Sequence, residues 1–182
     1  MLRGVNVTGH NMIKMEALRA LYESLGLRNP QTYIQSGNVV FRTKGRDLSA
    51  LAKRIENAIE RSFGFRPFVI VRTPDELRDV IAKSPFAGRR GINPSKLLVT
   101  FLASHPSAEA RELVLKLEVE PEELRIDGRE VFIHYPNGMA RPKLPWTKME
   151  KMLKTSGTGR NWNTVTKPVS YTHLTLPTKR IV

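Results

Sequence analysis

The side chains of this sequence best suited to hold a ligand are polar residues at the ends of apolar segments. They fall in four short stretches: Arg3 and Asn6; Gln35, Ser36, Gly37 and Asn38; Asn137, Arg141 and Lys143; and Arg160, Asn161 and Asn163. Small residues give a ligand access to backbone amides, and arginine can hold a phosphate or carboxylate through two parallel hydrogen bonds. This composition predicts a site for an anionic ligand. The alternative interpretation is that these side chains only tie loops together by hydrogen bonds.

Other kinds of site chemistry have little support in the residue pattern. Cysteine is absent, which excludes thiolate nucleophiles, disulfides and cysteine zinc sites. Ser36 lacks the upstream glycine of a nucleophile elbow, and no third glycine follows Gly157-Thr158-Gly159 at a dinucleotide-binding spacing. No pair of carboxylates stands out for acid–base catalysis. We therefore assign no catalytic residue and expect no cofactor, although His10 or His134 could act alone as an acid or base. We also expect no metal site, because no metal-ligand spacing relates the four histidines, His10, His105, His134 and His173.

The charge of the chain favours an anionic partner. The 182 residues carry a net charge of +13, divided as +7 over residues 1–74, −2 over 75–136 and +8 over 137–182. Two basic segments flanking a mildly acidic one suit phosphates, acidic metabolites or nucleic acid. A basic, solvated surface without a ligand is the alternative. No apolar run approaches a membrane span and no secretory signal is visible, so we expect a cytoplasmic protein and no membrane partner.

The N-terminal half, residues 1–74, carries the element order β-α-β-β-α-β. Tyr33-Ile34 and Val39-Val40-Phe41 have strand composition, and Gly37-Asn38 between them can form a bend or an ordinary hairpin turn. This order is typical of a ferredoxin-like sandwich. The other predicted elements are a strand end near Val5, a helix at Lys14–Leu25, a helix capped by Asp47 with Leu51, Ile55 and Ile59 inward, and a strand at Phe65–Arg72.

The C-terminal half, residues 75–167, predicts a second α+β arrangement with additional helices. A capping box at Thr73–Glu76 starts one helix, Leu97–Leu102 is an apolar strand, and Asp127-Gly128 predicts a hairpin. The remaining predictions are a helix capped by Ser107 with Leu113, Val114 and Leu117 inward, a capping box at Thr147–Glu150, and a last helix that starts near Arg160 and is capped by Thr158. Residues 168–182 contain two prolines in a threonine-rich run, and we expect them to be a non-native tail.

Four stretches together carry a family likeness: Leu2–Val7, Tyr33–Phe41, Tyr135–Gly138 and Arg160–Thr164. In that order they resemble the uncharacterised bacterial proteins of domain-of-unknown-function family 1697, from about Met1 to Lys167. The resemblance implies an α+β fold with ferredoxin-like halves, and it brings no activity, substrate or catalytic residue. Members of the family usually have more strand residues before Leu-Arg-Gly and a longer helix after Asn-Thr-Val. The resemblance therefore leads us to expect a fragment.

Two classes of function follow from the sequence. The first is a module that binds an anionic small molecule or nucleic acid, with the four polar stretches converging on one cleft. The aromatic pattern of RNA-binding ferredoxin-like sheets is missing, and Trp162 is better explained as a core or interface anchor. The second is an enzyme that acts on a small phosphorylated or nucleotide-like substrate through arginine and backbone donors. The sequence sets neither the ligand nor the oligomeric state.

Overall fold

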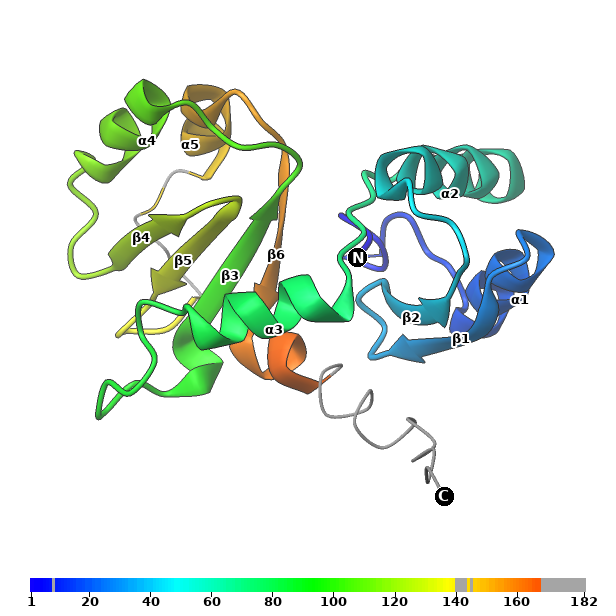
Figure 1. Ribbon diagram of the computed structural model, residues 1–182, viewed down its shortest axis with the longest axis horizontal. Coiled ribbons are helices and arrows are strands. Elements are labelled where there is room, and N and C mark those ends of the chain that lie inside the picture. The colour runs from blue at the N-terminus through cyan, green and yellow to red at the C-terminus, as the bar shows by residue number, and fades with distance from the viewer. Residues whose placement is uncertain (8, 140–143, 145, 168–182) are drawn as a thin grey trace, which may run out of the picture. The chain divides into compact units, whose positions relative to one another are not determined.

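The chain divides into two compact units, Met1–Arg72 and Thr73–Val182 (Figure 1). The structure, a computed structural model, describes all residues except 8, 140–143, 145 and 168–182. The predicted tail and the candidate site residues Arg141 and Lys143 lie outside the described residues. Each unit combines helices with its own antiparallel sheet, which confirms the predicted α+β class. No helix among the described residues combines the length and apolar character needed to cross a membrane.

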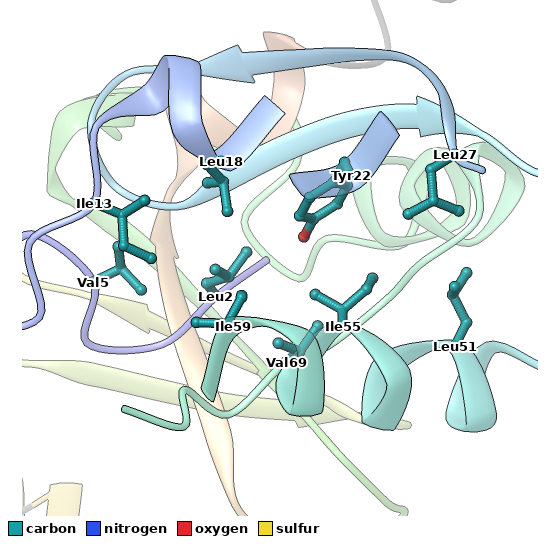
Figure 2. Close-up of a cluster of buried hydrophobic side chains, with 10 residues drawn as sticks. All are labelled: Leu2, Val5, Ile13, Leu18, Tyr22, Leu27, Leu51, Ile55, Ile59 and Val69. Carbon is teal, nitrogen blue, oxygen red and sulfur yellow. The ribbon is translucent and has the colours of Figure 1, made fainter. Parts of the chain in front are cut away.

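The first unit pairs two helices with a two-stranded antiparallel sheet. Its elements are α1 (Met15–Ser24), β1 (Arg28–Tyr33), β2 (Asn38–Arg42) and α2 (Leu48–Phe63), with Tyr33 opposite Asn38. Asp47 accepts a hydrogen bond from the Ala50 amide and caps α2, as predicted. The apolar faces of both helices meet in one core cluster (Figure 2), which contains Leu2, Val5, Ile13, Leu18, Tyr22, Leu27, Leu51, Ile55, Ile59 and Val69.

The segment at Phe65–Arg72 forms no regular strand, so this prediction was wrong. Its sheet-like contacts are one isolated bridge between Leu2 and Val69 and the flanking backbone hydrogen bonds to Met1 and Arg3. Pro67 lacks an amide hydrogen, which removes one donor from this stretch. The N-terminal residues also contact the β1–β2 turn, because Leu2 donates its amide hydrogen to the carbonyl oxygen of Gly37 at 2.9 Å. The first residues of the chain are thereby held beside the β1–β2 turn.

The second unit is built on a four-stranded antiparallel sheet. Its strands lie in the order β4 (Glu123–Asp127), β5 (Glu130–His134), β3 (Leu97–Leu102) and β6 (Gly157–Asn161). The helices α4 (Ala108–Leu115) and α5 (Trp146–Leu153) pack on each other (Figure 1). The core cluster of this unit includes Leu102, Val131, Met149 and Leu153. The predicted capping box at Thr73, the Ser107 cap and the Asp127-Gly128 hairpin are all present. The remaining elements of this unit are α3 (Pro74–Ala82) and η1 (Pro94–Lys96).

Strand β6 replaces the helix start that the sequence predicts around Thr158. Gly157, Thr158 and Gly159 pair with Leu102, Phe101 and Thr100 of β3, and the helical turns begin only at residue 162. A Cβ atom on Gly157 would lie 2.8 Å from Thr100 Cγ2 and 3.0 Å from the Phe101 carbonyl oxygen. Glycine is therefore required for close packing here, although its strand propensity is poor.

Two smaller predictions in the second unit were also wrong. Leu113 was expected to face inward but is 55% exposed, because Ala110 and Val114 form the buried face of α4. Helix α5 begins at Trp146, so Thr147 lies inside the helix rather than at its cap. The apolar pattern located both helices. For α4 the buried face differs from the predicted one by about one position, and for α5 the first residue does.

Candidate functional site

The Asn6 loop and the Gln35–Asn38 turn meet in the first unit. The Asn6 side-chain amide donates hydrogen bonds to the carbonyl oxygens of Ile13 and Gln35, both at 3.0 Å, and its Oδ1 accepts from the Ile13 amide at 2.7 Å. The predicted proximity of these two stretches is confirmed. The hydrogen-bonding groups of Asn6 are used inside the protein, which matches the interpretation that such side chains tie loops together.

The Gln35–Asn38 turn is fixed by its backbone and by one buried amide side chain. Gly37 has φ +72°, and a Cβ atom there would lie 2.9 Å from Leu2 Cβ. Asn38 is 5% exposed, and its Nδ2 donates to Ser36 Oγ at 2.8 Å. At the start of the turn, the exposed Ile34 has φ +49°, a strained value for a β-branched residue. These contacts define the conformation of the turn, and ligand binding there stays a prediction.

The other two polar stretches meet in the second unit around the short helix η1. Asn161 Nδ2 donates to the Ser95 carbonyl oxygen at 2.8 Å, and Lys96 Nζ donates to the Pro136 carbonyl oxygen at 2.5 Å. The loop of Asn137 and the strand end at Asn161 are thus joined through two neighbouring residues of η1. Asn163 donates its amide hydrogen to Asn161 Oδ1 at 3.0 Å. That all four stretches share one cleft stays a prediction, since the first two belong to one unit and the other two to the second.

Arg160 lies inside the second unit. It is 9% exposed and donates to Thr158 Oγ1 at 2.8 Å and to the Gly159 carbonyl oxygen at 2.7 Å. Burial lowers the pKa of its guanidinium to about 10. These contacts indicate a structural role within β6. A ligand-binding role for Arg160 stays a prediction.

A basic pocket in the first unit was not identified from the sequence. Its volume is about 620 Å³, and its basic lining residues are Arg28, Arg42, Lys44, Arg46 and Arg54. We call this site the basic pocket, and the name covers all of its lining residues. Its acidic lining residue is Asp47, the N-cap of α2. The apolar part of the lining consists of Leu25, Leu27, Ala50 and Leu51.

Strand register and helical periodicity bring these distant residues together. Arg28 of β1 lies directly opposite Arg42 of β2 in the antiparallel pair. Residues 47, 50, 51 and 54 occupy one stripe of α2, since residues three and four apart share a helix face. Arg54 donates a hydrogen bond from Nη2 to the Leu25 carbonyl oxygen, which attaches the stripe to the end of α1. The pocket is therefore held between the sheet end and the start of α2.

The spaced cations Arg42, Lys44 and Arg46 were the one visible signal for this pocket. They directly precede the Asp47 helix cap. Arg28 joins these cations only through the register of β1 and β2. To predict that register, one must know that β1 begins at Arg28. The sequence shows strand composition here only at Tyr33-Ile34, since Asn29 and Pro30 are poor strand residues.

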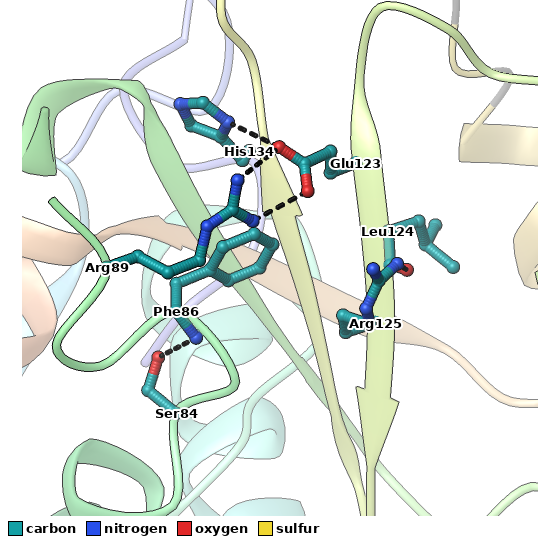
Figure 3. Close-up of polar contacts among 7 residues, drawn as sticks. All are labelled: Ser84, Phe86, Arg89, Glu123, Leu124, Arg125 and His134. Carbon is teal, nitrogen blue, oxygen red and sulfur yellow. Dashed lines mark hydrogen bonds and ion pairs between the residues drawn. The ribbon is translucent and has the colours of Figure 1, made fainter. Parts of the chain in front are cut away.

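A second charged cluster lies at the end of the sheet in the other unit (Figure 3). Arg89 forms two hydrogen bonds with the Glu123 carboxylate, at 2.6 and 3.0 Å, and its guanidinium lies 5.4 Å from the Phe86 ring centre. His134 Nδ1 lies 3.4 Å from Glu123 Oε1. The hydrogen bond from Arg89 lowers the pKa of Glu123, and His134 makes a smaller contribution in the same direction. Partial burial of the carboxylate raises this pKa but does not outweigh the two partners.

This cluster predicts a specific loss of stability in acid. Because the pKa of Glu123 is lowered by folding, its ion pair stabilises the fold fully above the unfolded pKa, about 4.3. That contribution disappears as the pH falls through the folded pKa. We expect Arg89→Gln to be less stable than wild type near pH 6 in urea unfolding, and the difference to shrink towards pH 3. Arg90→Gln is the control, and an undiminished difference for Arg89→Gln at pH 3 would contradict this account.

Comparison with known proteins yields a family and a fold. A family model described as a protein of unknown function (DUF1697) matches residues 1–132. Among solved structures, the conserved bacterial protein SP0830 from Streptococcus pneumoniae is similar, with a TM-score of 0.64 over 93% of this chain and 94% of its own. The two sequences are 21% identical, so the likeness shows the fold alone. No curated protein matches the chain.

Proposed function

We propose that this chain, which belongs to the DUF1697 family of proteins of unknown function, binds an anionic ligand in its basic pocket. The observation that carries the proposal is the excess of positive charge in the pocket: five cationic side chains and one carboxylate line it. In the part of the chain that the structure describes, Arg28, Lys44 and Arg46 form no ion pair with a carboxylate.

The two strands of the sheet bring like charges together in the pocket. Arg28 and Arg42 are Cα partners of β1 and β2, at an irregularity in the strand register. A bound anion would be attracted by both side chains. Arginine can also bind a phosphate through two parallel hydrogen bonds, which adds to the charge attraction.

The size of the pocket favours a small molecule over nucleic acid. Its volume of about 620 Å³ falls within the range of small-molecule sites, about 300 to 1,000 Å³. A nucleic-acid surface would instead follow the phosphate backbone along an extended row of cations. The alternative function is an enzyme that acts on a small phosphorylated or nucleotide-like substrate. Turnover of a bound phosphorylated compound would support that alternative.

We also propose that both units have the ferredoxin-like topology. The order β4-β5-β3-β6, with α4 and α5 as the two helical connections, supports this for the second unit. For the first unit, support comes from the backbone hydrogen bonds that place residues 1–3 between Gly37 and Phe68. Slow hydrogen exchange of the Leu2 and Arg3 amides, which donate to Gly37 and Phe68, would support this arrangement of the first unit.

Calorimetric titration of the full chain with inorganic pyrophosphate tests the proposed function. We expect saturable binding with one site at low salt and a weaker association as the sodium chloride concentration rises, because salt screens exposed charges. Sulfate at the same ionic strength is the comparison anion and should bind more weakly, since it carries less charge. Absence of pyrophosphate binding at low salt would overturn the proposed function.

Removing the carboxylate of the pocket should strengthen anion binding. Asn caps a helix about as well as Asp does, so Asp47→Asn preserves the bond from the Ala50 amide while it removes one negative charge. We expect a gain of about threefold in pyrophosphate affinity from this one charge near the surface, with an unchanged melting temperature. Weaker binding by a variant of unchanged stability would show that Asp47 does not oppose the anion.

A further inference from the structure

The basic pocket has an apolar side that an inorganic anion would leave unused. Leu27 and Leu51 are 3% and 6% exposed, and they form one end of the core cluster (Figure 2). Leu25 is half-buried and Ala50 is exposed, so both have surface available to a ligand. The pocket therefore presents apolar side chains beside a group of cations.

We infer that the ligand of the basic pocket is a nucleotide, with its phosphates on the cations and its base against the apolar lining. This inference rests on the proposed function and adds to it the chemical class of the ligand. A nucleotide combines a multiply charged phosphate group with a flat ring of low polarity on its faces. Both of these parts have a matching surface in the pocket.

The cations suit more than one phosphate group. Arg28 and Arg42 come from the strand pair, and Lys44 and Arg46 come from the segment that leads into α2. One phosphate needs only one or two such partners, whereas a diphosphate offers oxygens to several side chains at once. A diphosphate alone would occupy only a fraction of the cavity of about 620 Å³.

Arg54 gives the base a second surface. Its guanidinium donates a hydrogen bond to the Leu25 carbonyl oxygen, which holds the group beside the apolar lining. A guanidinium plane stacks on aromatic rings, and such stacking accepts any base because every base has a π face. The pocket should therefore accept nucleotides as a class and discriminate only weakly among their bases.

Adenosine diphosphate and inorganic pyrophosphate form the comparison that tests this inference, because they share the diphosphate group. We expect the full chain to bind adenosine diphosphate about tenfold more tightly in calorimetric titrations without metal ions. That factor corresponds to roughly 60 Å² of apolar surface removed from water. Guanosine and uridine diphosphates should bind within about threefold of the adenosine compound.

Two variants make the apolar lining polar while they leave the cations in place. Leu25→Gln keeps a similar volume, and Ala50→Gln places a good helix former at an exposed position of α2. We expect each to lose the preference for adenosine diphosphate over pyrophosphate, whatever its affinity for pyrophosphate itself. If Leu25→Gln unfolds, the nucleotide preference of Ala50→Gln alone tests the inference, since Ala50 is exposed and its substitution should not disturb the fold.

The possible outcomes separate the inference from the proposed function. Equal affinities of the wild type for the two diphosphates would overturn the nucleotide assignment and leave the proposed function intact. Failure of both compounds to bind would overturn both. Tighter binding of a single-stranded oligonucleotide than of any mononucleotide would overturn the inference in favour of nucleic acid. A nucleotide preference that survives in both glutamine variants would show that the base lies elsewhere.

Discussion

The double variant Arg28→Glu/Arg46→Glu should lose at least about 30-fold in pyrophosphate affinity relative to wild type. Each substitution removes charge-assisted hydrogen bonds and introduces a repulsive carboxylate into the basic pocket. A hydrogen bond to a charged group contributes about 1.5 to 3 kcal/mol, and about 1.4 kcal/mol corresponds to tenfold in affinity. Both side chains are exposed, so the fold should tolerate the change. Calorimetric titration at low salt measures the effect.

A matched control separates the pocket from the general charge of the protein. Lys53 and Arg61 lie on exposed positions of the same helix, α2, outside the pocket. The variant Lys53→Glu/Arg61→Glu changes the net charge by the same amount. With both double variants compared at about 0.1 M salt, we expect its affinity to stay within about threefold of wild type, because neither side chain lines the pocket and salt then screens exposed charges beyond about 10 Å. An equal loss in the two double variants would indicate attraction by net charge without a localised site.

The substitution Gly157→Ala should produce a large loss of stability in the second unit. Its new methyl group would lie 2.8 Å from Thr100 Cγ2 and 3.0 Å from the carbonyl oxygen of Phe101, and the backbone atom cannot move without disturbing β3. Forcing extra atoms into a packed interior costs about 1 to 3 kcal/mol, and we expect the upper part of that range. Urea unfolding measures the change in the free energy of unfolding.

Gly159→Ala in the same strand is the control for Gly157→Ala. Its methyl group would meet the side-chain end of Leu98 at 3.3 Å, which can shift to another rotamer. We expect a loss below about 1 kcal/mol, because Gly159 is exposed in β6. Equal losses for the two alanine variants would show that the contact with Phe101 does not limit the packing of β6.

Local signals in the sequence predicted the elements that depend on local physics. The Asp47 and Ser107 caps and the Thr73 capping box begin helices where they were expected, since a cap acts within one turn of the chain. The strand Leu97–Leu102 was predicted with its observed bounds, because a continuous apolar run between turn signals leaves few alternatives.

Strand β6 and the basic pocket required information that no local pattern holds. The residues Gly157–Asn161 have poor strand propensity, and they form a strand because β3 offers an edge that only glycine can approach closely. The pocket depends on Arg28 lying opposite Arg42, which follows from the strand register. Register and packing are tertiary properties, so composition alone predicted an anionic partner without predicting where it binds.

The polar stretches that first suggested a site have defined roles in the fold. Asn6 joins its loop to the carbonyl oxygen of Gln35, and Asn161 joins β6 to η1 through Ser95. These contacts explain why asparagine suits those positions without a ligand. Binding by the polar stretches stays a prediction that competes with the basic pocket.

One measurement tests the central claim most directly: amide chemical shifts of the isotopically labelled full chain during titration with pyrophosphate. The account predicts that the largest saturable changes occur at Arg28, at Arg42–Asp47 and at Arg54, which line the basic pocket. Changes that are largest at Gln35–Asn38, or at Asn137 and Asn161, would contradict the account in favour of the polar stretches. A spectrum unchanged by pyrophosphate would contradict anion binding by this chain altogether.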